Sequence, residues 1–339
     1  MPSTIRAADA RLSMKRVPTP ISRRAALAAM TALALPAQAQ VWPARPRRLI
    51  VPYPTGGLSD LVARAIGDRL AAQLGQPVVV ENKAGASGTI GMDALAKAPS
   101  DGYTLAFSAI SPLALSPALG KVPYDPERDF TPVASVMMSP VLLLATRITA
   151  ARDFRELITR AKDWPDTVRW ATSGQASLGH LMLEQLQAAA RVRLVHVPYK
   201  GGGQQITDAL SGQFEVLSVN AGPGLMDHIR SGRLRALAVG SPRRLQSLPQ
   251  VPTLAELGYP AANLASHFGV FAPGNLPVRI LDRLNSEINT AMEHPEVRVR
   301  LLASENVPTG GSARDFARQI AAEADSTARI VRAAGIKAE

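Results

Sequence analysis

The residues best placed to do chemistry lie in a glycine-rich segment, Arg48–Leu70, which reads RLIVPYPTGGLSDLVARAIGDRL. The apolar run Leu49–Val51 predicts a buried strand, and the spacing of the later apolar residues predicts a helix. Between them, Gly56 and Gly57 let the backbone approach a bound group closely because they carry no Cβ atom. The first N–H groups of a helix lack partners within it, and the helix dipole makes that end positive. The segment therefore predicts an anion site for the carboxylate of a small organic acid.

A purely structural interpretation of the same segment stands beside the binding one. Ser59 or Asp60 is placed to cap the predicted helix, and capping alone would explain the carboxylate of Asp60. Strand–turn–helix units are also common in α/β proteins, and a motif match is only a hypothesis. The binding interpretation therefore needs support from the rest of the chain.

The same order of strand, small polar turn and helix recurs at two later points. The first turn covers Thr55–Asp60, and the later ones cover Ser173–Ser177 and Asn220–Gly224. In open α/β sheets, ligands lie beyond the carboxyl ends of the strands. Several such turns at those ends predict a crevice for a small molecule.

Catalytic motifs are weak or missing from the sequence. Ser173 or Ser177 with His180 could form a nucleophile and its base, but a nucleophile elbow needs glycine where Gln175 stands. In Lys200–Gly203 the lysine precedes the glycines, which is the wrong order for a phosphate loop. No H-E-x-x-H zinc motif is present, and neither a metal nor a cofactor is expected. Binding is therefore favoured, with a periplasmic serine hydrolase acting on small esters and a partner-binding structural protein as the alternatives.

The composition is typical of a well-packed protein that can bind small anions. Hydrophobic residues make up 46% of the 339 residues, which is enough for the cores of about two domains. Aromatic residues make up only 4%, which argues against stacking platforms for single-stranded nucleic acid. Cysteine is absent, which excludes disulfides, thiol catalysis and cysteine-ligated metals. The net charge is +11, but the arginines are dispersed among acids, so no nucleic-acid partner is expected.

Residues 1–39 predict a cleaved export signal. Basic residues between Lys15 and Arg24 precede the apolar stretch Ala25–Leu35, which is too short to span a bilayer comfortably. The small-x-small sequence Ala37–Ala39 predicts cleavage just before Gln40. Six basic residues and one acid would leave with the signal, so the remaining chain would carry a net charge of +6.

Two features of this leader stay open at the sequence level. Ser22–Arg24 resembles a twin-arginine export signal, although ordinary secretory leaders also carry paired arginines. Met14 is an alternative start, because the residues before it add nothing that a signal needs. In either case the expected location is the periplasm, and no other stretch is apolar and long enough to span a membrane.

The rest of the chain alternates strands and helices, which predicts parallel sheets covered by helices. Ser108–Ser116 is expected to be a loop, and Pro277 is expected to start a helix that ends near Met292. Ser312 stands three residues before Asp315 and predicts a capped start for the last helix. The other predicted helices cover residues 89–97, 151–163, 181–190, 204–210 and 225–230. The predicted strands after the first cover residues 77–81, 103–107, 133–138, 141–145, 168–172, 193–197, 214–219, 234–239 and 268–272.

Eight sequence blocks, taken in order, carry a resemblance to a known family. They are VPYPTGGLSD, QPVVVENKAGASGTIG, KAPSDGYTL, YDPERDFTPV, VHVPYKGGG, SGRLRALAV, LPQVPTLAELGYP and VRAAGIKAE. Together they closely resemble the Bug proteins, TctC-like extracytoplasmic solute receptors related to tripartite tricarboxylate transporters. The resemblance covers nearly all of residues 45–339, and a receptor of this kind requires an export leader.

The resemblance implies a two-domain periplasmic binding protein fold, type II-like, with a ligand cleft between two α/β lobes. Each lobe would hold a mostly parallel sheet flanked by helices. The first domain would comprise residues 45–145 plus 268–339, and the second residues 146–267. The chain would cross between the lobes near Leu144–Thr146 and near Ser266–Phe268, and these crossings would act as hinges.

The resemblance also implies how the ligand is held. One carboxylate would be bound largely by backbone groups and waters from two opposed turns, Tyr53–Asp60 and Ser173–Ser177. Only the closed form supplies both turns, so closure and binding would be one event. The predicted ligand-binding residues are Tyr53, Thr55, Gly56, Gly57, Leu58, Ser59, Asp60, Ser108, Ser111, Ser173, Gly174, Gln175, Ser177 and Asn220.

Three departures from the family's usual pattern narrow the class of ligand that is expected. Thr55 replaces a proline and adds a hydroxyl, and Gln175 is long enough to shrink the pocket. Asn220 replaces an acid that would suit an amino group, so a cationic ligand group is disfavoured. The expected ligand is a neutral-to-acidic carboxylate, such as a di- or hydroxy-acid or a nicotinate-like aromatic acid. The expected protein partners are membrane subunits of a tripartite tricarboxylate transporter or a sensor, and the receptor itself is expected to be a monomer.

Overall fold

A computed structural model describes residues 42–334 of the chain. The described residues from Pro43 onward belong to one compact unit. The predicted leader with its cleavage site, the alternative start Met14 and residues 335–339 lie outside the described residues. The predictions made for those segments therefore stay predictions.

The first lobe is built on three parallel strands that continue into antiparallel ones. Strand β1 (Arg47–Val51) pairs in parallel with β2 (Val78–Asn82) and with β3 (Thr104–Ala109). Strand β9 (Ala265–Pro273) pairs antiparallel with β3 and with the long strand β4 (Phe130–Ala145). The short strand β10 (Val307–Pro308) joins β4. The predicted parallel pairing thus holds among β1, β2 and β3, and β9 makes the sheet mixed.

The second lobe uses the end of β4 as one of its own strands. Strands β6 (Val195–Pro198) and β7 (Val216–Asn220) pair in parallel with β5 (Arg169–Thr172). The end of β4, Val141–Ala145, pairs antiparallel with β7 and with β8 (Arg235–Gly240). Because β4 pairs with β9 through Pro140, a single strand serves both lobes. The domain boundaries given by the resemblance stay predictions.

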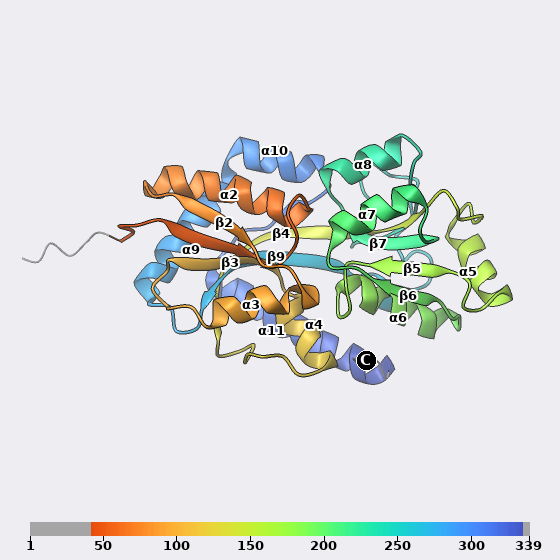
Figure 1. Cartoon of the computed structure of the whole chain (residues 1–339), viewed down its shortest axis with the longest axis horizontal. Coiled ribbons are helices and arrows are strands. Elements are labelled where there is room, and N and C mark those ends of the chain that lie inside the picture. The colour runs from red at the N-terminus through yellow and green to blue at the C-terminus, as the bar shows by residue number, and fades with distance from the viewer. Residues whose placement is uncertain (1–41, 335–339) are drawn as a thin grey trace, which may run out of the picture. The chain divides into compact units, whose positions relative to one another are not determined.

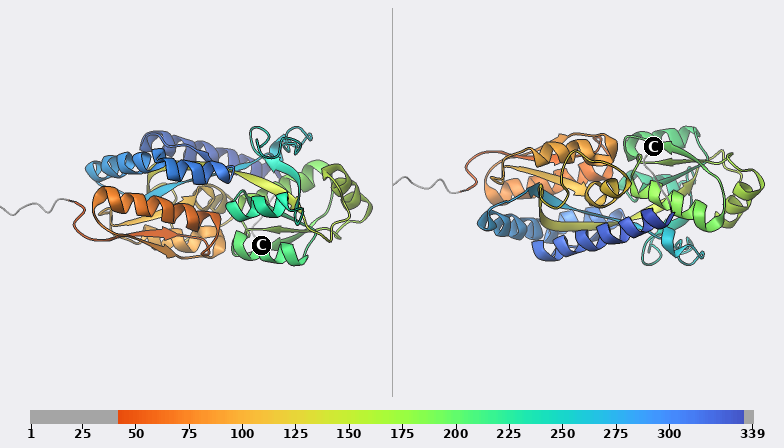
Figure 2. Two further views of the ribbon diagram at one scale, coloured as in Figure 1. Left: turned by 90° about the horizontal axis from the view of Figure 1, so that it is seen from above. Right: turned by 90° about the horizontal axis from the view of Figure 1, so that it is seen from below.

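Helices cover both faces of the first lobe. Figure 1 shows α2 and α10 above its strands and α3, α4 and α11 below them. At its C-terminal end α11 reaches the second lobe, where Val331 packs with Leu115 of α4 and Leu181 of α6 (Figure 2). The bounds are Leu58–Leu74 for α2, Ala86–Gly88 for η1, Thr89–Ala96 for α3, Ser111–Leu119 for α4, Val278–Glu293 for α9, Pro295–Ala303 for α10 and Ala313–Ala334 for α11.

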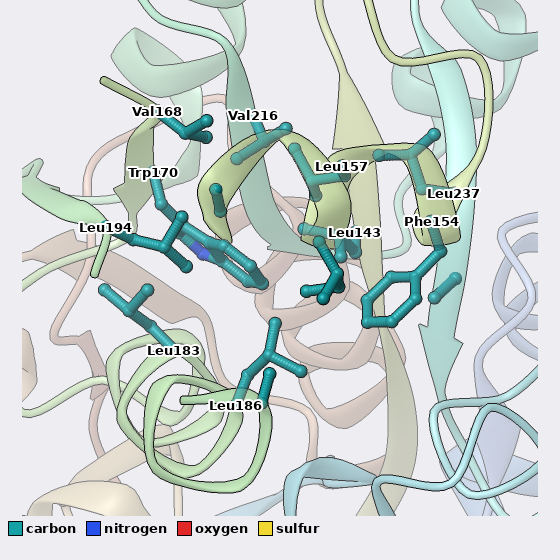
Figure 3. Packing of buried hydrophobic residues seen from close by; sticks show 14 of the residues in the cluster. Leu143, Phe154, Leu157, Val168, Trp170, Leu183, Leu186, Leu194, Val216 and Leu237 are labelled. Carbon is teal, nitrogen blue, oxygen red and sulfur yellow. The ribbon is translucent and has the colours of Figure 1, made fainter. Parts of the chain in front are cut away.

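The second lobe buries a core around Trp170 between its strands and two amphipathic helices, α5 and α6. The apolar side chains of α5 recur at helical spacing, so Phe154 and Leu157 both face the strands (Figure 3). The indole of Trp170 donates a hydrogen bond to Ser218 Oγ at 2.9 Å, which satisfies its buried N–H. The helices of this lobe are α5 (Phe154–Asp163), α6 (Leu178–Ala190), α7 (Gly202–Ser211) and α8 (Pro223–Arg230), with the short turn η2 (Pro260–Ala262).

Three local predictions are wrong in detail. The predicted loop Ser108–Ser116 is mostly helix α4, because its small residues are buried and adopt helical geometry despite Pro117. The two strands predicted on either side of Ser139 form the one strand β4. Helix α2 begins at Leu58 after the N-cap Gly57, so neither Ser59 nor Asp60 is its cap.

The predicted start of the last helix is confirmed. The Asp315 N–H donates to Ser312 Oγ at 3.1 Å, and the Ser312 hydroxyl lies 2.7 Å from the Asp315 carboxylate. Helix α9 follows Pro277, also as predicted. Helix α10 was not anticipated, because its apolar residues alternate with arginines and give a weak helical pattern.

Candidate ligand-binding cleft

A cleft of about 210 Å³ lies where the strands of both lobes end. The first residues of five helices line it: α2, α4, α6, α7 and α8. The first N–H groups of each helix have no partner within that helix, and each helix dipole places positive potential at this end. The lining residues at these five N-termini are Gly57, Leu58, Ser59, Ser111, Ser177, Leu178, Gly179, Gly201, Gly202, Gly203, Gly222, Gly224 and Leu225.

No formally charged side chain lines this cleft. Among the described residues that form its wall there is no lysine, arginine, aspartate or glutamate. His228 on α8 is the one lining side chain whose ordinary pKa lies near neutrality. Positive potential in the cleft therefore comes from backbone dipoles, and much of the remaining wall is apolar, including Val141, Ile206, Val219 and Phe268.

A buried carboxylate holds the turn before α2. Gly56 has φ +78°, a left-handed conformation that favours glycine, and its N–H donates to Asp60 Oδ2 at 3.0 Å. Arg64 lies 2.9 Å from the other oxygen of Asp60 and also donates to Asn82. Burial acts to raise the pKa of Asp60, but the hydrogen bonds from Arg64, the Gly56 N–H and Asn82 outweigh it, and the pKa is lowered. Asp60 thus organises the turn from behind and does not line the cleft.

Tyr53 is fixed on the inner side of the same turn. Its carbonyl accepts a hydrogen bond from Asn82 Nδ2 at 3.0 Å, and its hydroxyl lies 3.5 Å from Ser108 Oγ. Burial raises the pKa of Tyr53 above its ordinary value, so the phenol stays neutral. Its ring meets the Phe268 ring edge-on at 6.5 Å. A neutral phenol beside apolar surface can donate one hydrogen bond to an anion.

Two histidines hold the turn before α6. His180 and His196 stack in parallel with ring centroids 4.2 Å apart. The Ala176 N–H donates to His180 Nδ1 at 3.3 Å, and His196 Nε2 lies 2.8 Å from Thr172 Oγ1. Burial, followed by the nearby His180, lowers the pKa of His196 to about 4. Both rings therefore support the backbone of this turn, and the His196 ring is neutral near pH 7.

The contacts of His180 also bear on the alternative in which Ser177 and His180 act as a nucleophile and its base. Ser177 is the N-cap of α6, and its hydroxyl oxygen accepts the His180 N–H at 3.3 Å. The Nδ1 atom of His180 accepts the Ala176 N–H, and its Nε2 lies 3.6 Å from Glu184. The imidazole is thus turned to structural partners rather than to the Ser177 hydroxyl.

Glycine allows the two lobes to meet closely at the edge of the cleft. Gly201 has φ +147°, and a Cβ atom there would lie 2.6 Å from Pro54 Cδ of the first lobe. Gly174 has φ +145°, and a Cβ atom there would lie 2.5 Å from Ser87 Oγ. The Ser87 hydroxyl also donates a hydrogen bond to the Gln175 carbonyl across the lobes. Larger residues at either glycine would therefore push the lobes apart.

The structure brings most of the predicted ligand-binding residues together. Nine of them line the cleft: Tyr53, Gly56, Gly57, Leu58, Ser59, Ser111, Ser173, Ser177 and Asn220. Five others do not line it: Thr55, Asp60, Ser108, Gly174 and Gln175. In particular, the expectation that Gln175 narrows the cleft is not met, since Gln175 is not among the lining residues; its backbone carbonyl accepts a hydrogen bond from Ser87. The side-chain amide of Asn220 reaches the Ser139 carbonyl at 3.4 Å while lining the cleft.

Sequence reasoning missed several residues that line the cleft. The glycines 201–203 and the α8 residues Leu225 and His228 belong to it, as do Ser87 and Phe268. The three glycines after a strand were a usable signal, since they form the N-terminus of α7. No comparable signal marked His228, whose Nδ1 is buried without a hydrogen-bond partner in the described structure.

Between residues 42 and 334, no helix is both long enough and apolar enough to cross a membrane. In the same part of the chain, no group of three or more histidines and acids is arranged to hold a metal ion.

Comparisons with known proteins identify relatives that are similar over most of this chain. Protein BugT of Bordetella pertussis is 38% identical over 311 residues, which cover 91% of this chain and 95% of that protein. The solved structure described as "R. palustris Rpa4515 with adipate" is 33% identical, with a TM-score of 0.82 and coverage of 87% of this chain and 99% of that one. MatC from Rhodopseudomonas palustris "with bound malate" is 29% identical, with a TM-score of 0.81 and coverage of 86% and 100%.

The family comparison covers most of the chain. The profile described as "Tripartite tricarboxylate transporter family receptor" matches residues 62–336. This match includes α2 from Val62 onward, both histidines behind the second turn, and all of α7 and α8. The resemblance read from the eight sequence blocks is confirmed, and so is the two-lobe α/β fold of a periplasmic binding protein. The chain therefore belongs to the receptor family of the tripartite tricarboxylate transporters, which includes the Bug proteins.

Proposed function

We propose that this receptor captures a small organic carboxylate in the cleft between its lobes. The observation that carries the proposal is the convergence of five helix N-termini on a cleft whose described wall holds no charged side chain. Such a site offers many N–H donors and positive potential to one anion. It also avoids the cost of burying an unpaired lysine or arginine when the ligand is absent.

The proposed contacts to the carboxylate come from two facing helix starts. Leu58 and Ser59 open α2, while Leu178 and Gly179 open α6, and all four line the cleft. The N–H groups in these positions have no partners within their helices. In contrast, the Gly56 and Ala176 N–H groups are already bonded to Asp60 and His180, so they are not proposed as donors.

The proposed ligand class is a neutral-to-acidic carboxylate with an apolar middle section. Val141, Val219 and Phe268 would contact that section, while Asn220 and His228 offer polar contacts elsewhere in the wall. The related proteins described with adipate and malate support a di- or hydroxy-acid. A nicotinate-like aromatic acid is a further candidate, because Tyr53 and Phe268 offer ring surfaces.

Binding would be coupled to closure of the two lobes. The contacts of Gly201 with Pro54 and of Ser87 with Gln175 exist only when the lobes are close. A ligand that touches both helix starts would favour that form by its differential affinity. The bending would occur in β4, the strand that serves both lobes, and near the predicted crossings at Leu144–Thr146 and Ser266–Phe268.

Membership of a receptor family means that the chain is not an enzyme. We propose that it acts in the periplasm as a monomer and passes its ligand to membrane subunits of a tripartite tricarboxylate transporter or to a sensor. The predicted export leader supports this location. The serine hydrolase alternative loses support because the His180 ring contacts Ala176 and Glu184 rather than Ser177.

Isothermal titration calorimetry with adipate, malate, hexanoate and nicotinate tests the proposal. We expect at least one acid to bind, and the melting temperature to rise with the logarithm of its free concentration above the Kd. Mass spectrometry of whatever is released on denaturation would identify a ligand that co-purifies. Tight binding of amines or sugars and of no carboxylate would contradict the proposal. Ester hydrolysis that is lost in Ser177→Ala would instead support the hydrolase alternative.

A further inference from the structure

A second hollow lies at the opposite end of the second lobe's strands. Its volume is about 740 Å³, and its wall includes Ala145 at the end of β4 and Arg235 at the start of β8. The ligand cleft lies at the other end of this sheet, beside Val141 and Asn220. The two spaces share no lining residue, so the hollow is a separate feature.

Positive charge is concentrated around this hollow. Five exposed arginines, which come from three separate segments, line it: Arg147, Arg152, Arg155, Arg233 and Arg235. The one acid in the wall is Asp153, whose carboxylate is used as the N-cap of α5. A surface with this ratio of arginine to acid attracts anions and repels cations.

Most of these arginines have no carboxylate partner within the described chain. Arg152 forms an ion pair with Glu156, at 2.7 Å. Arg147 donates instead to the Ser211 carbonyl, and Arg233 donates to the Ser231 hydroxyl. Arg155 forms no ion pair among residues 42–334, and Glu156, the partner of Arg152, also interacts electrostatically with Arg235, so the rim keeps a net positive charge. Guanidinium groups bind carboxylates through two parallel hydrogen bonds, and Arg155 has no competing ion pair in the described part of the chain.

The floor of the hollow is apolar. Phe154, Leu234, Leu237 and Val251 contribute to it, and each also belongs to the buried core of the lobe. These floor side chains are at most 5% exposed, so the surface offered to a partner is mainly the arginine rim. A small inorganic anion could meet only part of a rim whose arginines come from separate segments, whereas a chain segment with several carboxylates could meet more than one of them at once.

We propose that this arginine hollow is a docking site for an acidic segment of a protein partner. The segment would place two or more Asp or Glu side chains against Arg155, Arg233 and Arg235. Helix α8 separates the hollow from the ligand cleft, since Ile229 faces the hollow and Leu225 and His228 face the cleft. A partner docked here would therefore leave the cleft open to the ligand, and the inference does not depend on the proposed ligand class.

Fluorescence anisotropy with a labelled peptide, acetyl-Glu-Glu-Leu-Glu-Glu-amide, tests the docking site in the full mature chain. We expect the double variant Arg155→Glu with Arg233→Glu to weaken peptide binding at least about tenfold, because two attractive charges become repulsive. The matched control is Arg279→Glu with Arg298→Glu, two exposed arginines outside the hollow that change the net charge equally. The control should change the Kd less than about twofold at physiological salt, where distant surface charges are screened.

Several outcomes would overturn the inference. Equal losses in the two double variants would mean that net charge alone attracts the peptide. No binding by the unmodified chain, or equal binding of the same peptide with glutamine in place of glutamate, would also overturn it. Binding to phosphatidylglycerol vesicles that depends on Arg155 and Arg233 while the peptide fails to bind would assign the hollow to a lipid surface instead. Thermal melting of each variant, together with the milder pair Arg155→Gln and Arg233→Gln, separates lost docking from lost folding.

Discussion

The two turns that face each other across the cleft each lead into a helix but are held by different side chains. The first turn is organised by a carboxylate, Asp60, which accepts the Gly56 N–H and pairs with Arg64. The second is supported by two stacked histidine rings, since His180 contacts Ala176 and His196 contacts Thr172. A carboxylate supports one side of the site and imidazole rings support the other, so changes in sequence or pH should affect the two turns differently.

The largest expected effect comes from adding a side chain at the first turn. Gly57→Val should weaken carboxylate binding by about 100-fold, because the side chain would fill space beside the proposed donors. The fold should survive, since a Cβ atom at Gly57 meets only the Pro54 carbonyl at 3.7 Å. Calorimetry measures the loss, and Gly57→Ala is the matched control with a much smaller expected effect. Affinity unchanged in Gly57→Val would mean that this turn does not hold the ligand.

Removing the charge behind the first turn should have the next largest effect. Asp60→Asn leaves the shape of the side chain but weakens its bonds with Gly56 and Arg64, so the turn should loosen. We expect a loss of about 1–3 kcal/mol in the free energy of unfolding, the usual cost of disturbing a hydrogen bond to a charged group. Chemical denaturation measures this change, and calorimetry should show weaker ligand binding.

The exposed residue Asp68 on the same helix is the control for that experiment. Asp68→Asn should change stability by less than about 0.5 kcal/mol, as is usual for an exposed surface position. If Asp60→Asn changed the free energy of unfolding as little as Asp68→Asn, the charge of Asp60 would not stabilise the first turn.

Acid should weaken the second turn through His196. Its folded pKa of about 4 lies below its ordinary value of 6.5, so the unfolded chain takes up the proton first as pH falls. The free energy of unfolding should therefore decrease between about pH 6.5 and pH 4. One pKa unit corresponds to about 1.4 kcal/mol, and we expect a loss of about 1–2 kcal/mol after allowing for partial exposure of the ring.

Urea denaturation between pH 7 and pH 4 measures this dependence on pH. His196→Gln should flatten the curve in that window, because glutamine can still contact Thr172 but does not titrate. A curve that keeps its slope in His196→Gln would assign the acid sensitivity to other groups.

The smallest expected effect concerns His228, on the wall between the turns. Burial and the nearby Arg233 lower its pKa, so a neutral imidazole faces the cleft at pH 7. If it bonds a second acidic group, His228→Ala should weaken adipate binding by about threefold to tenfold, the usual worth of a neutral hydrogen bond. Hexanoate has the same chain with one carboxylate, so its affinity should hardly change. Equal losses of affinity for adipate and hexanoate would mean that His228 contributes to the shape of the cleft and does not recognise the second carboxylate of adipate.

The sequence was most informative where function depends on local backbone geometry. The run from Leu49 through the double glycine to the following helix predicted a strand, a turn and a helix start, and the structure contains all three, with the turn and the helix start in the cleft wall. Ser312 predicted the start of α11 for the same reason, because a cap involves residues only three positions apart. Prediction failed at α4, where burial rather than local preference decides that small residues form a helix.

Only the folded chain decided which groups face the ligand and which support the backbone behind it. Asp60 and Gln175 were indistinguishable from binding residues in the sequence, yet their partners are Gly56, Arg64 and Ser87. His228 and the arginine hollow likewise depend on segments far apart in the chain that the sheet brings together. The physical reason is that the hydrogen bonds of a turn form between residues close together in the sequence. The direction of a side chain depends instead on how segments far apart in the sequence pack together.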